Sequence, residues 1–452
     1  MAIAAQKEEK VLVVGLGVSG RAVCTLLRSR GADVTATDIR QRADFNGALD
    51  GLETSGCTLR LGEHSVEDFI GADRVIVSPG IPLDIEPLAA ARRRGVEIVG
   101  ELEWAWRQVE LPSIAVTGTN GKTTTTALIG EMLKRAGKKA FVGGNIGTPL
   151  SQWLLAGEDA EVLVLEVSSF QLDTATRFSP DVGVLLNVTE DHLDRYDSFE
   201  AYADSKFSVF QRQNARGFAV INGDDPVCRK RIPELQGTVL VFSTSDPAAN
   251  ACVVNNRVRV ALPGKEPFEL ALDSTKLTGA HNRENIMAAS LAAAAMDISP
   301  AAIQAAIDGF AGLPHRMEWV RSWHGVDFYN DSKGTNVGAV VKALEGFDRP
   351  VLLLLGGKDK LGSYEPLVAP LRRTGKAIFA YGDAGPKIYE ALRQSIPARL
   401  FSDLEAAFRE AVGRASTGDV VLLSPACSSF DQYESYGQRG NHFRKLAAGL
   451  AD

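Results

Sequence analysis

Short apolar runs alternate with helical patterns along this chain, and the alternation restarts twice. Val11–Val14 opens the first series, Ile114–Val116 opens the second after a proline, and a third series includes Val351–Leu355. Strands that alternate with helices build parallel sheets, because a parallel pair needs a crossover that is usually a helix. The pattern therefore predicts an α/β protein with three units. Only residues 251–272 change to polar-apolar alternation with turns, which predicts a small antiparallel excursion.

Composition agrees with this organisation and excludes several classes of protein. The 452 residues are 45% hydrophobic and 23% charged, which is ordinary globular usage. The net charge of −7 argues against a nucleic-acid partner. No run approaches the ~18 apolar residues that a membrane span requires. Five scattered cysteines indicate reduced thiols, so we expect a cytoplasmic protein. We place the domains at residues 1–100, 101–313 and 314–452.

The first glycine-rich loop, Gly15-Leu-Gly17-Val-Ser-Gly20, follows the first strand and opens the first helix. Asp38 ends the second strand, eighteen positions after Gly20. This context is typical of a Rossmann-like domain that binds a nucleotide or a nucleotide-sugar pyrophosphate at a helix N-terminus. A tight turn without a ligand is the alternative, and the fingerprint alone would suggest a nicotinamide dehydrogenase.

A second loop lies between a strand and a helix in the middle of the chain, with the sequence Gly118-Thr-Asn-Gly121-Lys122-Thr123-Thr124. A phosphate loop uses successive backbone amides and a lysine to hold β- and γ-phosphates, with a hydroxyl on Mg²⁺. Val116 occupies the position of the usual leading glycine, so the motif is not strict. Lys122 and two adjacent hydroxyls still favour ATP binding over a purely structural turn.

Polar residues follow two further apolar strands of the middle domain. Glu166 comes at the end of residues 162–165, and Asp191-His192 lies shortly after residues 182–186. Ligands of open α/β sheets bind at the carboxyl ends of strands, so both segments should lie near the phosphates. A carboxylate and a neutral imidazole suit a phosphate-bridging Mg²⁺. Taken alone, Asp191 could cap a helix and His192 could be an ordinary surface histidine.

Asn282 and Asn285 precede an alanine-rich helical segment at residues 288–295. Residues three apart share a face of a helical turn, so both amides can reach one ligand. An adenine edge or a phosphate would suit them, and helix capping is the alternative.

Together these segments resemble the ATP-dependent Mur ligases, which form amide bonds in cell-wall precursor synthesis. The resemblance rests on Gly118–Thr124, Glu166, Asp191-His192, His281–Asn285 and Leu313-Pro-His-Arg316, in the expected order. It covers essentially the whole chain. It implies a Rossmann-like first domain, a central phosphate-loop domain and a Rossmann-like α/β third domain. We hypothesise that the third domain swings over ATP about a hinge near Gly312-Leu-Pro314.

Within the family, two C-terminal segments resemble the branch that adds D-glutamate to UDP-N-acetylmuramoyl-L-alanine. They are Asn330–Asn336 and Leu423–Tyr436. The first glycine loop is similar to the one that this branch uses for the UDP end of its substrate. The resemblance therefore implies an acyl-phosphate ligase whose partners are these two small molecules, and we expect a monomer.

The resemblance also implies which residues bind ATP and metal. The ATP positions are Gly118, Thr119, Asn120, Gly121, Lys122, Thr123, Thr124, Asn282, Asn285, Arg316 and Asp331. Two Mg²⁺ ions would be held by Thr123, Glu166, His192 and Lys206. Lys206 matches a lysine that the family carbamylates with CO₂, although by composition alone it is a solvated helix lysine. The implied catalytic residues are Lys122, Lys206, His192, Glu166 and Arg316.

The implied substrate positions fall into two sets. The nucleotide-sugar set is Gly17, Val18, Ser19, Asp38, Ile39, Arg40, Ser78, Gly80, Asn145 and His192. The D-glutamate set is Lys333, Thr335, Lys360, Ser429, Phe430 and Tyr436. Residues 356–360 offer two lysines, Lys358 and Lys360, and the alignment favours Lys360.

Three other functions use part of these features. A folate polyglutamate ligase would use a similar phosphate loop but would not need Gly15–Gly20. A nicotinamide dehydrogenase would use Gly15–Gly20 and leave Lys122, Glu166 and His192 without a role. A non-catalytic ATP-binding regulator would need no glutamate pocket. Phosphate release that depends on D-glutamate separates the ligase from all three.

Overall fold

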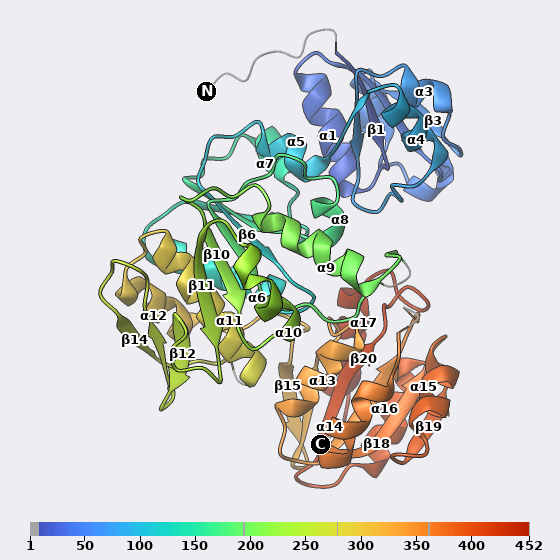
Figure 1. Cartoon of the computed structure of the whole chain (residues 1–452). Helices are drawn as coiled ribbons and strands as arrows, with labels where there is room; N and C mark the ends of the chain where they lie inside the picture. The colour runs from blue at the N-terminus through green and yellow to red at the C-terminus, as the bar shows by residue number, and fades with distance from the viewer. Residues whose placement is uncertain (1–8, 193–194, 278, 360–361, 452) are drawn as a thin grey trace.

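The protein forms three α/β units, each built around its own sheet, in a computed structural model (Figure 1). The structure describes residues 9–192, 195–277, 279–359 and 362–451. We call the units the N-terminal, central and C-terminal domains. The sheets are mostly parallel, which confirms the predicted fold class.

The N-terminal domain is a five-stranded parallel sheet in the order β3-β2-β1-β4-β5. Its strands are β1 (Lys10–Val14), β2 (Asp33–Asp38), β3 (Thr58–Leu61), β4 (Arg74–Val77) and β5 (Glu97–Gly100). Its helices are α1 (Val18–Ser29), η1 (Arg42–Phe45), α2 (Asp50–Thr54), α3 (Val66–Ile70) and α4 (Glu86–Arg93). This strand order is the Rossmann order, so the switch point lies between β1 and β4, beside the first glycine loop.

The central domain has a nine-stranded sheet in the order β14-β13-β12-β11-β10-β9-β6-β8-β7. The strands are β6 (Ser113–Thr117), β7 (Ala140–Gly144), β8 (Val162–Glu166), β9 (Val182–Leu185), β10 (Phe218–Asn222), β11 (Thr238–Ser243), β12 (Ala251–Val254), β13 (Arg257–Val260) and β14 (Phe268–Ala271). Strands β12, β13 and β14 pair antiparallel, as the sequence predicts, and extend the parallel sheet at one edge.

Helices cover both faces of the central sheet. They are α5 (Glu101–Trp106), α6 (Lys122–Arg135), α7 (Leu150–Ala156), α8 (Ser169–Leu172), α9 (Phe199–Phe207), η2 (Ser208–Phe210), α10 (Pro226–Arg231), η3 (Ile232–Glu234), α11 (Ala280–Ala295) and α12 (Pro300–Gly309). The alanine-rich helix α11 is almost wholly buried against α6, because its small side chains let the two helices approach closely. It begins eight residues before the segment that composition alone singles out.

The C-terminal domain has a six-stranded sheet in the order β15-β16-β20-β17-β18-β19, with only β15 antiparallel. Its strands are β15 (Glu318–Trp323), β16 (Val326–Asn330), β17 (Val351–Gly356), β18 (Gly375–Tyr381), β19 (Ala398–Phe401) and β20 (Val420–Ala426). Its helices are α13 (Val337–Glu345), η4 (Glu365–Leu367), α14 (Val368–Thr374), α15 (Gly385–Leu392), α16 (Leu404–Arg414) and α17 (Tyr436–Ala448). The hairpin of β15 and β16 is not among the predicted strands.

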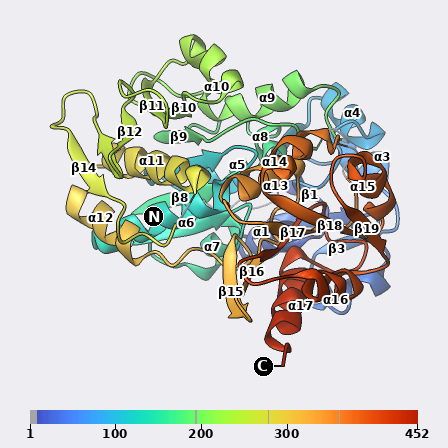
Figure 2. The ribbon, with the colours of Figure 1, turned by 90° about the horizontal axis from the view of Figure 1, so that it is seen from below.

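The three domains meet around the carboxyl ends of the central strands. Helix α7 packs against α1 of the N-terminal domain, and α13 of the C-terminal domain contacts α11 (Figures 1 and 2). None of the described helices combines the length and apolarity that would be needed to cross a membrane. All five cysteines are buried and free.

Candidate active site

The phosphate loop connects the end of β6 to the start of α6 and needs glycine at two positions. Gly118 and Gly121 have φ values of 141° and 87°. A Cβ on Gly121 would lie 2.4 Å from Asn285 Oδ1, so no larger residue fits there without movement. Lys122 folds back over the loop, and its Nζ donates to the carbonyls of Gly118 (2.8 Å) and Thr119 (2.9 Å). Its ammonium group therefore lies in the loop, where a phosphate-binding cation is expected.

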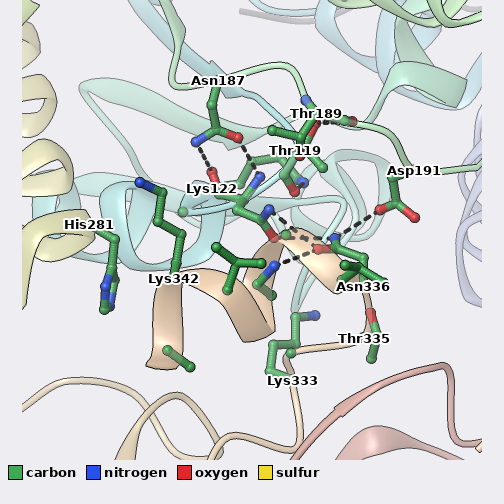
Figure 3. Close-up of a pocket in the computed structure, with 18 of the residues that line it drawn as sticks. Thr119, Lys122, Asn187, Thr189, Asp191, His281, Lys333, Thr335, Asn336 and Lys342 are labelled. Atoms are coloured by element: carbon green, nitrogen blue, oxygen red, sulfur yellow. Dashed lines mark hydrogen bonds between the residues drawn. The ribbon is translucent and has the colours of Figure 1, made fainter. Parts of the chain in front are cut away.

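Asn187, the second residue after β9, holds the phosphate loop from the side. Its Oδ1 accepts from Asn120 N at 2.9 Å, and its Nδ2 donates to Asn120 O at 3.1 Å (Figure 3). Thr119 Oγ1 in turn donates to Thr189 O at 3.1 Å. Asn187 begins the polar segment that the sequence places near the phosphates, because it follows a strand of the same sheet, but the sequence analysis gave it no role of its own.

Glu166 ends β8 and is buried beside Asn145. Asn145 Nδ2 donates to Glu166 Oε1 at 2.9 Å, whereas Oε2 has no hydrogen-bond partner among the described residues. A buried carboxylate oxygen without a donor is costly, and a cation is one natural partner for it. Within the described residues, no three His, Cys, Asp or Glu side chains form a metal-binding group. Mg²⁺ commonly binds one or two carboxylates together with substrate phosphates, so the donors present here fit it.

Lys206 lies on α9 behind the phosphate loop, and its side chain is completely buried. Its Nζ donates to the same Gly118 carbonyl that Lys122 uses, at 3.0 Å, and lies 4.5 Å from the Tyr202 ring centroid. Burial lowers the pKa of Lys206 well below its usual value, and the nearby charge of Lys122 lowers it further. Lys206 is therefore a buried lysine with a lowered pKa, in contrast to the solvated lysine that composition suggests.

His192 lies at the end of a cluster of aromatic rings and lines the same cavity as Glu166 and the phosphate loop. It has φ of 54°, and its ring packs edge-on against Phe170 at 4.9 Å between centroids. Arg195 also contacts the Phe170 ring, with its Cζ 4.8 Å from the centroid. The Arg195 guanidinium donates to the carbonyls of Gly80 and Ile81 in the N-terminal domain. This cluster joins the segment of His192 to the N-terminal domain.

The first turns of α11 bring the predicted amides against the phosphate loop. Asn285 Nδ2 donates to Asn282 Oδ1 at 3.2 Å, and Asn285 Oδ1 accepts from Thr125 Oγ1 at 3.2 Å. His281 is adjacent, and burial lowers its pKa to about 4, with further lowering by the charges of Lys342 and Arg316. A neutral imidazole and two amides suit a polar, uncharged group.

The C-terminal domain contributes cations and a carboxyl group to the same site. Arg316 Nη2 donates to Thr123 Oγ1 at 2.8 Å. Asp331 is buried and accepts from Ser424 Oγ at 2.7 Å, and burial raises its pKa to about 6. Lys333 Nζ lies 4.1 Å from the ring centroid of Tyr436.

These groups surround one cavity of about 750 Å³ between the central and C-terminal domains. The predicted residues that line it are Thr119, Asn120, Gly121, Lys122, Thr123, Thr124, Asn145, Glu166, His192, Asn282, Asn285, Arg316, Asp331, Lys333 and Thr335. This volume is within the range of small-ligand sites. The cavity lining includes cationic side chains, although the chain as a whole is net acidic. Gly118 and Lys206 lie behind this lining and are connected to it through their shared hydrogen bond.

The predicted nucleotide-sugar residues of the N-terminal domain form a second group at the carboxyl ends of β1, β2 and β4. Asp38 accepts from Leu16 N at 2.7 Å and pairs with Arg40 at 2.7 Å. Ser78 Oγ donates to Gly15 O at 2.7 Å. Val18 and Ile39 are strongly exposed, at 57% and 66%. The members of this group are Gly17, Val18, Ser19, Asp38, Ile39, Arg40, Ser78 and Gly80.

Three predicted glutamate-site residues lie on the loop after β20 and the start of α17. Ser429 is buried, whereas Phe430 and Tyr436 are 69% and 36% exposed. Tyr436 reaches the cavity lining through Lys333, and the other two do not line the cavity itself. Lys360 lies outside the described residues.

Arg439 on α17 is a residue that the sequence analysis missed. Its side chain is fully buried and donates to Ser332 Oγ (3.0 Å), Ser332 O (2.9 Å) and Cys427 O (3.1 Å). It also reaches Gly356 O at 3.4 Å. One guanidinium thus joins the ends of β16, β17 and β20, and nothing in its sequence neighbourhood distinguishes it from a surface arginine.

Family models match each of the three domains. Residues 9–100 match the Mur ligase MurD-like N-terminal domain, residues 116–293 the Mur ligase middle domain, and residues 315–427 the Mur ligase glutamate ligase domain. The chain belongs to the Mur ligase family.

Two curated relatives match nearly the whole chain, and both are named UDP-N-acetylmuramoylalanine–D-glutamate ligase. The relative from Desulfosudis oleivorans is 45% identical over 448 residues, covering 98% of each chain. The relative from Desulfatibacillum aliphaticivorans is 43% identical over 445 residues, covering 98% of this chain and 99% of its own.

Solved structures share the fold. A pseudomurein peptide ligase type C from Methanothermus fervidus has a TM-score of 0.62 at 19% identity, covering 98% of this chain and 100% of its own. A MurF ligase from Thermotoga maritima has a TM-score of 0.61 at 19% identity, covering 98% and 96%.

Proposed function

We propose that this chain is an ATP-dependent ligase that joins D-glutamate to UDP-N-acetylmuramoyl-L-alanine. The observation that carries the proposal is the single cavity in which the phosphate loop of one domain faces Arg316 and Lys333 of another. The full-length similarity to ligases with that printed name supports the choice of substrates. The reaction belongs to peptidoglycan precursor synthesis, and we place it in the cytoplasm, carried out by a monomer.

Amide formation needs activation, because a carboxylate is a poor electrophile. In the proposed mechanism the γ-phosphoryl group of ATP passes to an oxygen of the alanyl carboxylate, and ADP leaves. The neutral amine of D-glutamate then attacks the acyl phosphate carbon. Collapse of the tetrahedral intermediate breaks the carbon–oxygen bond to phosphate, the nitrogen loses a proton, and the amide remains.

Phosphoryl transfer depends mainly on alignment and charge neutralisation. Lys122 lies in the phosphate loop and Arg316 reaches that loop from the C-terminal domain, so the two cations suit the β- and γ-phosphates. Asn282, Asn285 and Asp331 are proposed to hold the adenine and ribose side. Closure of the C-terminal domain over the cavity would exclude water, which would otherwise hydrolyse the acyl phosphate.

Glu166, Thr123 and His192 are proposed to hold Mg²⁺. The metal supplies charge neutralisation to the phosphates when bound. The Oε2 of Glu166, which has no hydrogen-bond partner among the residues that the structure describes, fits this assignment. Asn145 orients Glu166 through its other oxygen, and the same asparagine is a proposed contact of the nucleotide sugar.

Lys206 is proposed to carry a carbamate that completes a second metal site. Carbamylation requires a neutral amine to attack CO₂, and burial, which lowers the pKa of Lys206, favours that form. The product is an anionic oxygen ligand beside Lys122, which replaces repulsion between two ammonium groups by attraction.

The outer domains would present the two substrates that are joined. The N-terminal group around Asp38 and Ser78 is proposed to bind the uridine diphosphate end. In the C-terminal domain, Lys333, Thr335, Ser429, Phe430 and Tyr436 are proposed to bind D-glutamate, together with Lys360.

Phosphate release tests the proposal. The enzyme is incubated with ATP, Mg²⁺ and UDP-N-acetylmuramoyl-L-alanine, and either D- or L-glutamate is added. We expect phosphate release with the D-isomer only. Equal release with both isomers, or release with neither, would remove the proposed function. A folate substrate or a nicotinamide cofactor in place of the nucleotide sugar serves as the control for the alternatives.

A further inference from the structure

Helix α13 of the C-terminal domain begins directly on the phosphate loop of the central domain. Its capping residue, Asn336, is 8% exposed and contacts two central segments at once (Figure 3). Gly338, in the first turn of α13, also lies close to the central domain. A Cβ on Gly338 would lie 3.2 Å from Thr189 Oγ1 and 3.5 Å from Asn120 Nδ2. The close approach of α13 to the loop therefore depends on small or polar side chains.

The Asn336 amide uses its hydrogen-bonding groups in one defined orientation. Its Oδ1 accepts from Ala339 N at 2.8 Å, which caps α13 and fixes which side of the amide is oxygen. Its Nδ2 must then face the central domain, where it donates to Asp191 Oδ2 (3.1 Å) and Asn120 Oδ1 (3.2 Å). Asn120 Nδ2 returns a hydrogen bond to Asn336 Oδ1 at 3.4 Å.

Both central partners of Asn336 are adjacent to residues with a proposed chemical role. Asn120 comes two residues before Lys122, and its backbone is already held by Asn187. Asp191 precedes His192, and its Oδ1 accepts from His192 N at 3.0 Å. One side chain from the C-terminal domain thus orders the phosphate loop and the His192 segment together.

We infer that Asn336 is a positioning residue that aligns the phosphate loop and the His192 segment only when the C-terminal domain is seated. We call Asn336 with Asn120 and Asp191 the Asn336 clasp. This inference rests on the proposed ligase function for its activity measurements. It differs from a structural role because the phosphate loop, Asn282 and Asn285 can still bind nucleotide without the clasp, whereas alignment for phosphoryl transfer needs it.

Asn336→Asp is the sharpest variant. Aspartate keeps the acceptor that caps α13, so the C-terminal domain should fold normally. It loses the donor and places a carboxylate against Asp191 and Asn120 Oδ1. Because the variant loses a hydrogen bond to a charged group and gains a like-charge contact, we expect kcat to fall about 100-fold. The dissociation constant of ADP, measured by calorimetry, should rise by less than about tenfold, because the contacts from the phosphate loop, Asn282 and Asn285 remain while those from the C-terminal domain weaken. Asn255→Asp, on an exposed hairpin turn, is the matched control.

Small-angle scattering provides a readout independent of turnover. With ADP and Mg²⁺, the Asn336→Asp enzyme should have a larger radius of gyration than the wild type. A second substitution, Asp191→Asn, restores the hydrogen bond between positions 191 and 336 in the opposite direction. The new amide at position 191 can donate to the carboxylate introduced at position 336. This double variant should return toward the compact form.

Wild-type kcat in Asn336→Asp would overturn the inference. So would a wild-type radius of gyration in the single variant, or a double variant that stays as open as the single one. Absence of D-glutamate-dependent turnover in the wild type would instead remove the proposed function, and the scattering comparison would still decide the clasp.

Discussion

Replacing Asp331 by asparagine should stabilise the C-terminal domain at pH 8. The Asp331 carboxyl group is buried, and burial raises its pKa to about 6 from an ordinary value of 3.8. Between pH 3.8 and about pH 6, the native protein therefore binds more protons at Asp331 than the unfolded chain does. Stability falls as pH rises through this window, and the loss is complete above pH 6. A difference of about two pKa units corresponds to about 3 kcal/mol.

Asparagine removes this penalty because it has no charge to desolvate. It keeps an oxygen for the 3.3 Å hydrogen bond from Met317 N, and the Ser424 hydroxyl can rotate to accept from the new amide. The gain should therefore be about 3 kcal/mol at pH 8. At pH 5 the native carboxyl group is largely protonated, so the gain should shrink to about half that value.

Hydrogen exchange in urea measures this change for the C-terminal domain alone, through peptides from β20. With a slope of about 1–3 kcal/mol per molar urea, the midpoint at pH 8 should rise by about 1–3 M. Asp348→Asn, at an exposed position of the same domain, is the control. An equal shift at both pH values, or a lower midpoint at pH 8, would refute the link between burial of Asp331 and stability.

Three further variants test separate parts of the site. Lys122→Ala should reduce ADP formation at least ~1000-fold, because it removes the cation of the phosphate loop; measurable turnover at a tenth of the wild-type rate would contradict that role. Lys206→Ala should be inactive and partly rescued by acetate, whereas normal turnover without additives would remove the carbamate. Arg195→Ala should raise KM for the nucleotide sugar about tenfold and leave KM for ATP unchanged, because it loses the hydrogen bonds to Gly80 and Ile81; an equal effect on both would argue against a specific link to the N-terminal domain.

The parallel strands and both glycine loops were predictable because their signals are local. A buried strand followed by a glycine turn and a helix is specified within about twenty residues, as at Val11–Gly20. The hairpin of β15 and β16 also has a local sequence signal, the glycine at position 325 between two β-rich runs, which the prediction did not use. His324 and Gly325 both have positive φ and join two runs with paired ends Trp323 and Val326, as a two-residue hairpin turn does.

The contacts between distant segments were not predictable in the same way. Asn336 lies 216 residues from Asn120, and an asparagine before a helix is read most simply as a cap. It is a cap here, and the second function of its amide follows only from the tertiary structure. The pKa of Lys206 is a similar case, because it depends on burial and on the nearby Lys122 rather than on its own helix.

The buried Arg439 has an electrostatic consequence for the C-terminal domain. Its charge is held by carbonyls and a hydroxyl, and no carboxylate is among these hydrogen-bond partners. Dissolved ions cannot approach a fully buried guanidinium, so its field is weakly screened by salt. The guanidinium at the ends of β16, β17 and β20 therefore interacts with neighbouring buried groups, the Asp331 carboxyl group among them, with less screening by salt than a surface lysine would.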